Sequence, residues 1–147
     1  MSEGISFEEY LNQHGTLTYS NVGVSMLPLL RQGKDLLTVN KKGIERCKKG
    51  DVVLYRRPPD QYVLHRIIEV RPQDYVILGD NCVAREYGIR DEDIIGVLTS
   101  YVRDGKEHKI TEPGYRIYSF VWLHTWPIRV MLKKTGGRLK RVLLKKK

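Results

Sequence analysis

The sequence predicts a mainly β protein with a short N-terminal helix and a basic, partly helical C-terminal tail. Six runs rich in β-branched and aromatic residues lie between Thr16 and Arg103. Turn-forming segments, such as Arg-Pro-Pro-Asp at 57–60, separate these runs, as expected for strands. Because no long pattern of helical period stands between the runs, we expect antiparallel pairing rather than βαβ units.

The first expected element is a helix over residues 7–13. Ser6 and Glu9 have the spacing of a capping box, in which the serine hydroxyl and the acidic side chain bond to free amides of the first turn. Gly15 is placed to end this helix. The β-rich domain is predicted over residues 1–112 and the tail over residues 113–147. The strands are expected at Thr16–Val24, Asp35–Asn40, Asp51–Arg56, Tyr62–Val70, Tyr75–Leu78 and Ile94–Arg103.

Length and composition indicate an ordinary folded domain. A chain of 147 residues can bury a core without disulfide staples. A content of 41% hydrophobic and 29% charged residues excludes a disordered polar chain. Cys47 and Cys82 form neither a CxxC pair nor a ligand-spaced cluster with the four histidines. We therefore expect no metal site, and we assume a reducing compartment.

The net charge of +9 resides in the tail. Residues 113–147 contain ten basic and no acidic side chains, so the first 112 residues carry a net charge of −1. The acidic N-terminus lacks the features of a signal peptide. The apolar stretch Ile117–Leu132 is interrupted by His124, Pro127 and Arg129 and is shorter than the ~20 residues of a spanning helix. We expect a cytoplasmic protein, or one held peripherally at the cytoplasmic face of the membrane.

Three residues carry the groups that acyl transfer needs. Ser25 is closely followed by Pro28, which restricts the backbone past the serine and could fix an amide as an oxyanion donor. His65 shares one face of an alternating run with two apolar residues, a half-buried place that suits a general base. Asp80 lies in a Gly-Asp-Asn turn after an apolar run and could orient the imidazole. Glu86 is a second carboxylate for that role.

Each of these residues also has an ordinary structural role. Ser25 would be a turn residue beside a buried Met26, His65 a histidine at the edge of the core, and Asp80 the cap of its own turn. Taken singly, the structural role is favoured at each position. Only the combination points to a site.

In combination, these residues give the chain a resemblance to the type I signal peptidase family of serine peptidases, which is related to the self-cleaving repressor peptidases. The resemblance covers roughly residues 16–105. It implies a coiled β-sheet peptidase body. It rests on short segments that occur in the family's order, namely Gly23–Pro28, Gly33–Leu37, Lys49–Tyr55, Val63–Ile68, Leu78–Asn81 and Ile95–Val97.

The resemblance also implies a role for each candidate. Many bacterial members pair the serine with a lysine, whereas this chain has His65 at that position, as in the serine/histidine branch. Ser25 is then the nucleophile, and His65 is the general base and acid. Asp80 matches the family's turn and is expected to orient His65, with Glu86 as the alternative. The oxyanion and substrate-binding positions are expected at Gly23, Met26 and Pro28.

Three features depart from the family pattern. Gly23 replaces the serine whose hydroxyl helps to form the oxyanion hole in many bacterial members, which leaves backbone donors such as the Ser25 amide. Cys82 replaces the second asparagine of the turn segment. The N-terminal membrane anchor is missing, so we expect removal of a leader from a small precursor peptide.

The expected function is that of a serine endopeptidase acting on a peptide or precursor protein through an acyl-enzyme, without a metal or organic cofactor. The alternative is an inactive member of the same fold that binds peptides or a membrane. Residues 115–147 combine aromatic, apolar and basic side chains that suit an anionic membrane surface. In the other interpretation, Tyr115–Trp126 packs on the body and the lysines are solvated. Nucleic-acid binding ranks third, because no base-reading motif accompanies the charge.

Overall fold

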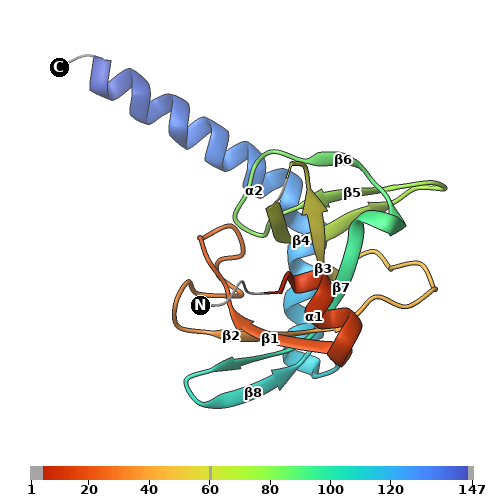
Figure 1. Ribbon diagram of the computed structural model, residues 1–147. Helices are drawn as coiled ribbons and strands as arrows, with labels where there is room; N and C mark the ends of the chain where they lie inside the picture. The colour runs from red at the N-terminus through yellow and green to blue at the C-terminus, as the bar shows by residue number, and fades with distance from the viewer. Residues whose placement is uncertain (1–4, 60, 146–147) are drawn as a thin grey trace.

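The computed structural model describes residues 5–59 and 61–145, the last nine of them by their backbone alone. Within this part of the chain the structure is mainly β, with one helix before the sheet and one after it (Figure 1). The helices are α1 (Phe7–His14), a 3-10 turn (Asp91–Asp93) and α2 (Pro113–Lys145). The strands are β1 (Thr16–Ser20), β2 (Leu36–Lys41), β3 (Val52–Arg57), β4 (Gln61–Val70), β5 (Tyr75–Leu78), β6 (Glu86–Ile89), β7 (Ile94–Arg103) and β8 (Lys106–Lys109).

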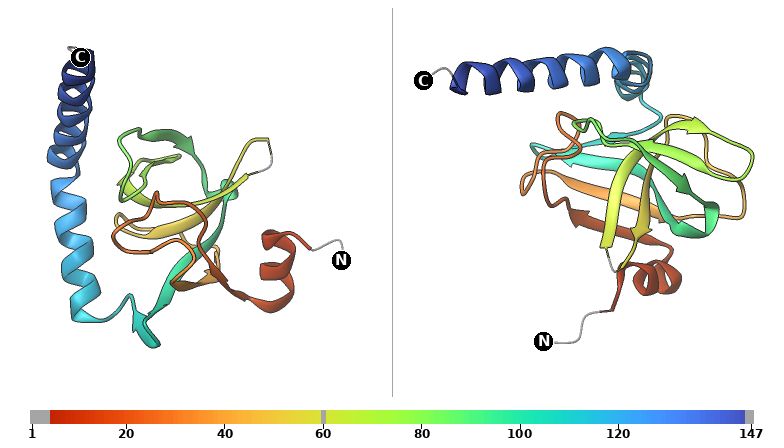
Figure 2. Two further views of the ribbon diagram at one scale, coloured as in Figure 1. Left: turned by 90° about the vertical axis from the view of Figure 1, so that its left-hand side faces the viewer. Right: turned by 90° about the horizontal axis from the view of Figure 1, so that it is seen from above.

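The strands form one antiparallel sheet. Its order is β1-β2-β7-β3-β4-β5-β6, and β8 pairs with β7. The register shifts within four of the pairings, and irregularities of this kind bend strands and increase their twist. Figure 2 shows the result, with the strands curving around the interior. The prediction of a mainly β body is confirmed.

Five of the six predicted strands lie within one residue of their expected limits. The exception is β1, which ends at Ser20 rather than Val24 because the chain leaves the sheet there to form the loop that carries Ser25. The sequence does not predict β6 and β8. Both are four-residue strands at the margins of the sheet, and they contain charged residues or glycine in place of a β-branched run.

The predicted N-terminal helix is confirmed to within one residue of its limits, and of the two bonds of the predicted capping box the one to the Ser6 hydroxyl is present. The Ser6 hydroxyl accepts a hydrogen bond from the Glu9 amide at 3.1 Å. Gly15 has a φ of 78°, in the left-handed region that favours glycine, and its amide donates to the Leu11 carbonyl at 2.8 Å. Leu11 is buried in the main core cluster and fixes the helix against the sheet.

Helix α2 begins at Pro113, where the basic tail is expected to begin. Figures 1 and 2 show its first half lying along the body and its second half projecting beyond it. Pro127 lies inside the helix, and a proline both lacks the amide for a helical hydrogen bond and crowds a carbonyl of the preceding turn. This accounts for the bend between the first and second halves of α2. No helix in the described residues is long and apolar enough to cross a membrane.

The first half of α2 buries one face of β4. Arg66 of that strand bonds to Ser119 of the helix, and Ile68 belongs to a cluster against which Leu123 and Trp126 pack. His65 lies on the opposite face, as the alternation of the strand predicts. Both faces of β4 are therefore covered at this point, and both His65 and its neighbour Arg66 are buried.

Candidate active site

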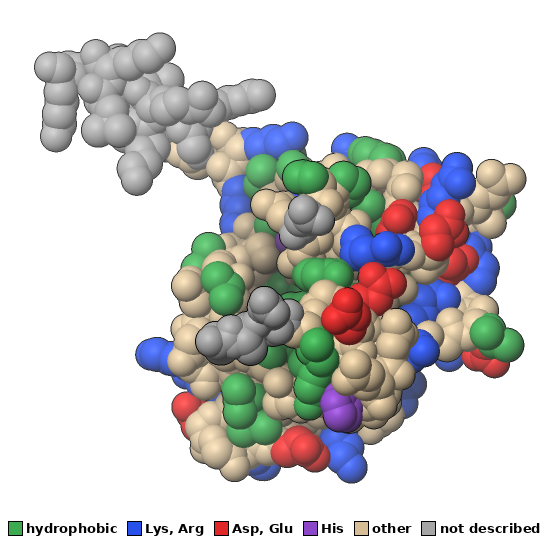
Figure 3. Space-filling model, in the orientation of Figure 1, with side chains coloured by type: hydrophobic (Ala, Val, Ile, Leu, Met, Phe, Trp, Pro, Cys, Tyr) green, Lys and Arg blue, Asp and Glu red, His purple; other side chains and the backbone are tan. Residues whose placement is uncertain are grey.

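Ser25 and His65, forty residues apart in the sequence, line one open cleft of about 740 Å³. Its walls come from the end of β1 and the loop that follows, from the start of β4, and from the segment that joins β5 to β6. Figure 3 shows a hollow on this face of the molecule, with apolar side chains around it. The fold thus brings the two principal candidates of the sequence to the same place.

Two side chains, one from β3 and one from β6, hold the Nδ1 side of His65. The Tyr55 hydroxyl lies 3.3 Å from Nδ1, and Glu86 Oε1 lies 3.8 Å from it. Tyr55 donates its own proton to Glu86 Oε2 at 2.8 Å, so its oxygen is left to accept from Nδ1. Arg57 donates to the same carboxylate and to the Tyr55 hydroxyl. This pattern favours a proton on Nδ1 and leaves the lone pair on Nε2.

His65 is neutral near pH 7. Burial lowers the pKa of the imidazole to about 4, against the opposing effect of Glu86 and with a further lowering by Arg57. A neutral imidazole whose Nε2 carries the lone pair can accept a proton, whereas a charged one cannot. His65 is therefore in the unprotonated state that a general base requires, and its lowered pKa makes it a weaker base than a solvent-exposed imidazole.

A turn between β5 and β6 fixes the backbone around Ser25. The Asn81 amide donates to the Ser25 carbonyl at 2.8 Å, and the Asn81 side chain donates to the Val24 carbonyl at 3.0 Å. No hydrogen bond joins the Ser25 hydroxyl to His65 within the described residues, and Cys82 Sγ lies 4.0 Å from Nε2. Catalytic hydrogen bonds are often long in a free enzyme and tighten when substrate binds.

Gly79 permits the close approach of the serine loop to the imidazole. A β-carbon at this position would lie 2.8 Å from the Ser25 carbonyl oxygen, 2.9 Å from Cδ2 of His65 and 2.6 Å from Cys82 Sγ. These distances are shorter than van der Waals contacts, so a residue with a side chain would push the two apart. The glycine of the Gly-Asp-Asn turn therefore has a packing role in the site.

Asp80 does not take the place beside His65 that the resemblance implies. Its carboxylate forms a bidentate pair with Arg66, at 2.8 and 2.9 Å, and accepts a hydrogen bond from Tyr118 at 2.8 Å. The reason is that His65 and Arg66 point to opposite faces of β4, and Asp80 reaches the face of Arg66. Glu86, the alternative candidate, is the carboxylate next to His65.

Helix α2 supports the turn that fixes Ser25. The Trp122 indole nitrogen donates to the Asp80 carbonyl at 2.9 Å, and the Lys133 ammonium donates to the Asn81 carbonyl at 2.7 Å. Asn81 in turn bonds to the serine loop. The C-terminal helix is therefore part of the structure that positions the candidate nucleophile.

The three residues expected to bind the oxyanion or the substrate lie outside the cleft lining. Met26 is fully buried, and its Sδ accepts a hydrogen bond from the Asp80 amide at 3.4 Å. The Pro28 carbonyl is held by Arg103 at 2.8 Å. Gly23 has a φ of 89° and allows the loop to turn. These residues shape the loop after β1, and their role in binding the oxyanion or the substrate stays a prediction.

Sequence reasoning missed Tyr55, Arg57 and Asn21. The first two follow each other at alternate positions of β3, but which residues of β4 they face depends on a register that a single sequence does not show. Asn21 lines the cleft, is only 8% exposed, and its side-chain nitrogen has no hydrogen-bond partner among the described residues. A buried donor without a partner at the edge of a cleft is available to a ligand.

Cys82 is a weaker nucleophile candidate than Ser25. Burial raises the pKa of its thiol, so the sulfur stays protonated at neutral pH. In residues 5–59 and 61–145, no three His, Cys, Asp or Glu side chains converge in a way that could hold a metal ion.

No protein-family model, curated protein or solved structure matches the chain. A function for it therefore rests on the geometry of the cleft and on the order of the sequence segments that build it.

Proposed function

We propose that this protein is a serine peptidase that cleaves a peptide bond through an acyl-enzyme at Ser25. The observation that carries the proposal is a buried, neutral His65 that lines the same cleft as the serine. Its Nδ1 is held by Tyr55 and Glu86, so that Nε2 is left as the base. A serine hydroxyl is a useful nucleophile only where a base takes its proton, and this arrangement supplies one.

In the first half of the reaction, Ser25 Oγ attacks the carbonyl carbon of the peptide while His65 Nε2 takes the hydroxyl proton. The Glu86 carboxylate and the Tyr55 hydroxyl stabilise the imidazolium that forms. His65 then gives the proton to the amine nitrogen as the C–N bond breaks. In the second half, neutral His65 deprotonates a water that attacks the ester carbonyl. His65 then returns that proton to Ser25 Oγ as the C–Oγ bond breaks, which releases the acid and restores both side chains. Backbone donors, among them the Ser25 amide, receive the oxyanion.

The cleft suits an extended peptide with apolar side chains. Val22, Val63 and Leu64 contribute apolar surface to its lining. The unpaired Nδ2 of Asn21 can donate to a substrate carbonyl, and satisfying a buried donor of this kind is worth roughly 1–3 kcal/mol. These features, with the ordered sequence segments, support a precursor or leader peptide as the substrate. They also support the coiled β-sheet fold of the signal and repressor peptidases.

A second candidate is an inactive member of the same fold that binds a peptide without cleaving it. The observation that favours it is the missing hydrogen bond between the Ser25 hydroxyl and His65 within the described residues, with Cys82 Sγ 4.0 Å from Nε2.

A fluorophosphonate, which phosphonylates activated serines, separates the two candidates. We expect the wild-type protein to be labelled at Ser25 and the Ser25→Ala variant to be unlabelled. Ser20→Ala is the matched control, because Ser20 lines the same cleft, and Cys82→Ser tests the neighbouring thiol. Both controls should be labelled as the wild type is. Labelling that survives Ser25→Ala would refute the assignment of the nucleophile, and an unlabelled wild-type protein would favour the binding function.

Replacing Gly79 by alanine is expected to slow this labelling about 100-fold, since the new methyl group must displace the serine loop or the imidazole, and a shift of about 1 Å has an effect of that size. The measurement is the second-order labelling rate. Gly43→Ala is the control, because a β-carbon there meets nothing within 4 Å. A Gly79→Ala protein that reacts at the wild-type rate would contradict the packing described here.

A further inference from the structure

Helix α2 presents a second apolar face to the outside. Six large apolar side chains on it are 44–66% exposed. At about 100° per residue they fall within an arc of roughly 120°, opposite the face that packs on the sheet. These outer-face residues are Ile117, Phe120, Val121, Ile128, Met131 and Leu132.

An exposed apolar stripe of this length calls for a partner. A helix that packs one face on a domain normally carries polar residues on the other, and contiguous apolar patches on a surface mark sites of association. Measured along the axis of the bent helix, the stripe extends about 22 Å from Ile117 to Leu132 at 1.5 Å per residue, and the exposed His124 lies within it. It continues past Pro127 onto the half of α2 that projects beyond the body (Figure 1).

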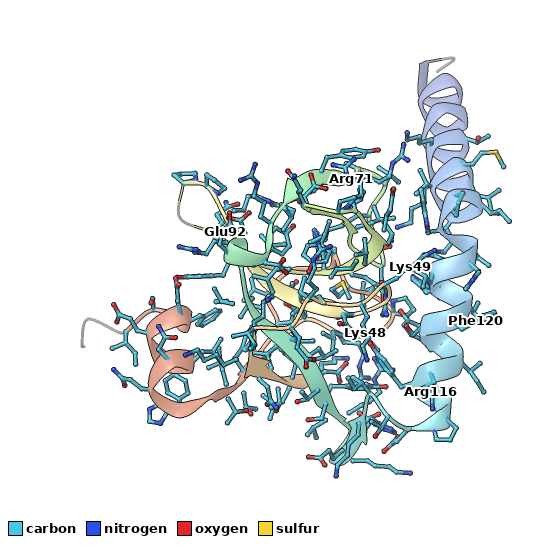
Figure 4. All side chains as sticks on the ribbon, turned by 90° about the vertical axis from the view of Figure 1, so that its right-hand side faces the viewer. Lys48, Lys49, Arg71, Glu92, Arg116 and Phe120 are labelled. Carbon is cyan, nitrogen blue, oxygen red and sulfur yellow. The ribbon has the colours of Figure 1, made fainter. Side chains whose placement is uncertain are left out.

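Cations border the stripe. Arg116 and Lys134 are exposed on the same helix. Lys49, from the loop before β3, lines a groove of about 280 Å³ together with Arg116 and Phe120. Figure 4 shows Lys49 beside the helix that carries Arg116 and Phe120. Residues 113–147 as a whole have ten basic and no acidic side chains.

We propose that the outer face of α2 docks on an anionic lipid surface, with the helix lying along the surface and its apolar side chains below the headgroups. Moving exposed apolar side chains out of water lowers the free energy of the bound state, and the negative surface potential of the membrane attracts each nearby Lys or Arg. The charge distinguishes this occupant from a second copy, because pairing two such helices would bring twenty cations together. A nucleic acid would use the cations but not Phe120 or Leu132. The proposal is independent of catalysis at Ser25.

Sedimentation of the full chain with vesicles tests it. We expect binding to vesicles that contain phosphatidylserine, a loss of binding with phosphatidylcholine alone, and weakening by salt. Phe120→Gln combined with Leu132→Gln should weaken binding about tenfold or more, because both side chains are exposed and the changes leave the packed face intact. Ile44→Gln is the matched control, since Ile44 is fully exposed outside α2, and it should bind as the wild type does.

The charge is tested in the same assay. Lys134→Gln should weaken binding about fivefold, while Arg90→Gln, an exposed cation away from α2, should have little effect. Equal binding to both kinds of vesicle, or no loss in the Phe120/Leu132 variant, would overturn the proposal. A dimer in analytical ultracentrifugation that the Phe120/Leu132 variant abolishes would assign the face to a second copy. Binding of duplex DNA without binding of phosphatidylserine vesicles would assign it to nucleic acid.

Discussion

Replacing His65 by glutamine is expected to slow fluorophosphonate labelling of Ser25 by about 10⁴-fold. Glutamine has a similar volume and can still bond to Tyr55, so the loss reports the missing base rather than a cavity. The second-order labelling rate measures the effect. Urea unfolding should show that the variant is folded, and a variant that reacts within tenfold of the wild type would exclude His65 as the base.

The pH dependence of the wild-type protein provides an independent test of the same residue. Only neutral His65 can accept the proton, so the labelling rate falls as the pH drops through its pKa. Burial places that pKa at about 4 instead of its usual value of 6.5. The rate should thus be nearly constant from about pH 8 to pH 5.5 and fall below it. An acid limb centred near 6.5 would show that the imidazole is solvated.

Glu86→Gln serves as the control for this limb. Its carboxylate raises the pKa of His65 against the effect of burial. Removing the charge should therefore move the acid limb to lower pH, while the loss of imidazolium stabilisation lowers the plateau rate. Circular dichroism at each pH shows whether the protein stays folded across the range.

The sequence predicts that Ser25 and His65 meet, because both lie in short segments whose order resembles that of the type I signal peptidase family. It predicts the strands for a more general reason, since short runs rich in β-branched and aromatic residues between turn-forming segments favour strands. It does not predict that Tyr55 and Arg57 lie at the site. Their place there follows from the strand register, in which Val53 is opposite His65 and the following residues of β3 lie near the imidazole. Pairing of this kind is a property of the folded sheet.

The choice between the two carboxylates shows the same limit. Asp80 lies in the expected turn, yet its carboxylate forms an ion pair with the buried guanidinium of Arg66, which is on the other face of β4 from His65. The sequence predicts a partly helical tail but not a helix from Pro113 to Lys145, because the glycines and Pro127 disfavour a continuous helix locally. Packing of Tyr115, Leu123 and Trp126 on the sheet outweighs that local preference. The interpretation in which Tyr115–Trp126 packs on the body is confirmed.

Replacing Asp80 by asparagine is expected to lower the free energy of unfolding by about 3–5 kcal/mol. The side chains of Asp80 and Arg66 are each only 1% exposed, and their bidentate pair is the main compensation for burying both charges. Without the carboxylate charge, Arg66 stays buried between the sheet and α2. Urea unfolding measures the loss, and a change below about 1 kcal/mol would mean that water reaches the pair.

Two comparisons show whether burial of the Asp80–Arg66 pair causes this loss of stability. Arg71 and Asp74 form a pair with the same bidentate geometry at the surface, where the side chains are 36% and 21% exposed. Asp74→Asn should therefore cost less than about 1 kcal/mol. Combining Arg66→Met with Asp80→Asn removes both charges and should recover much of the loss, because an apolar side chain can occupy a buried site that an unpaired cation cannot. The turn around Asp80 also bonds to the loop of Ser25, so the Asp80→Asn protein should react more slowly with the fluorophosphonate even while folded. If adding Arg66→Met restores the free energy of unfolding but not the labelling rate, the turn has a role in positioning Ser25 apart from its role in stability.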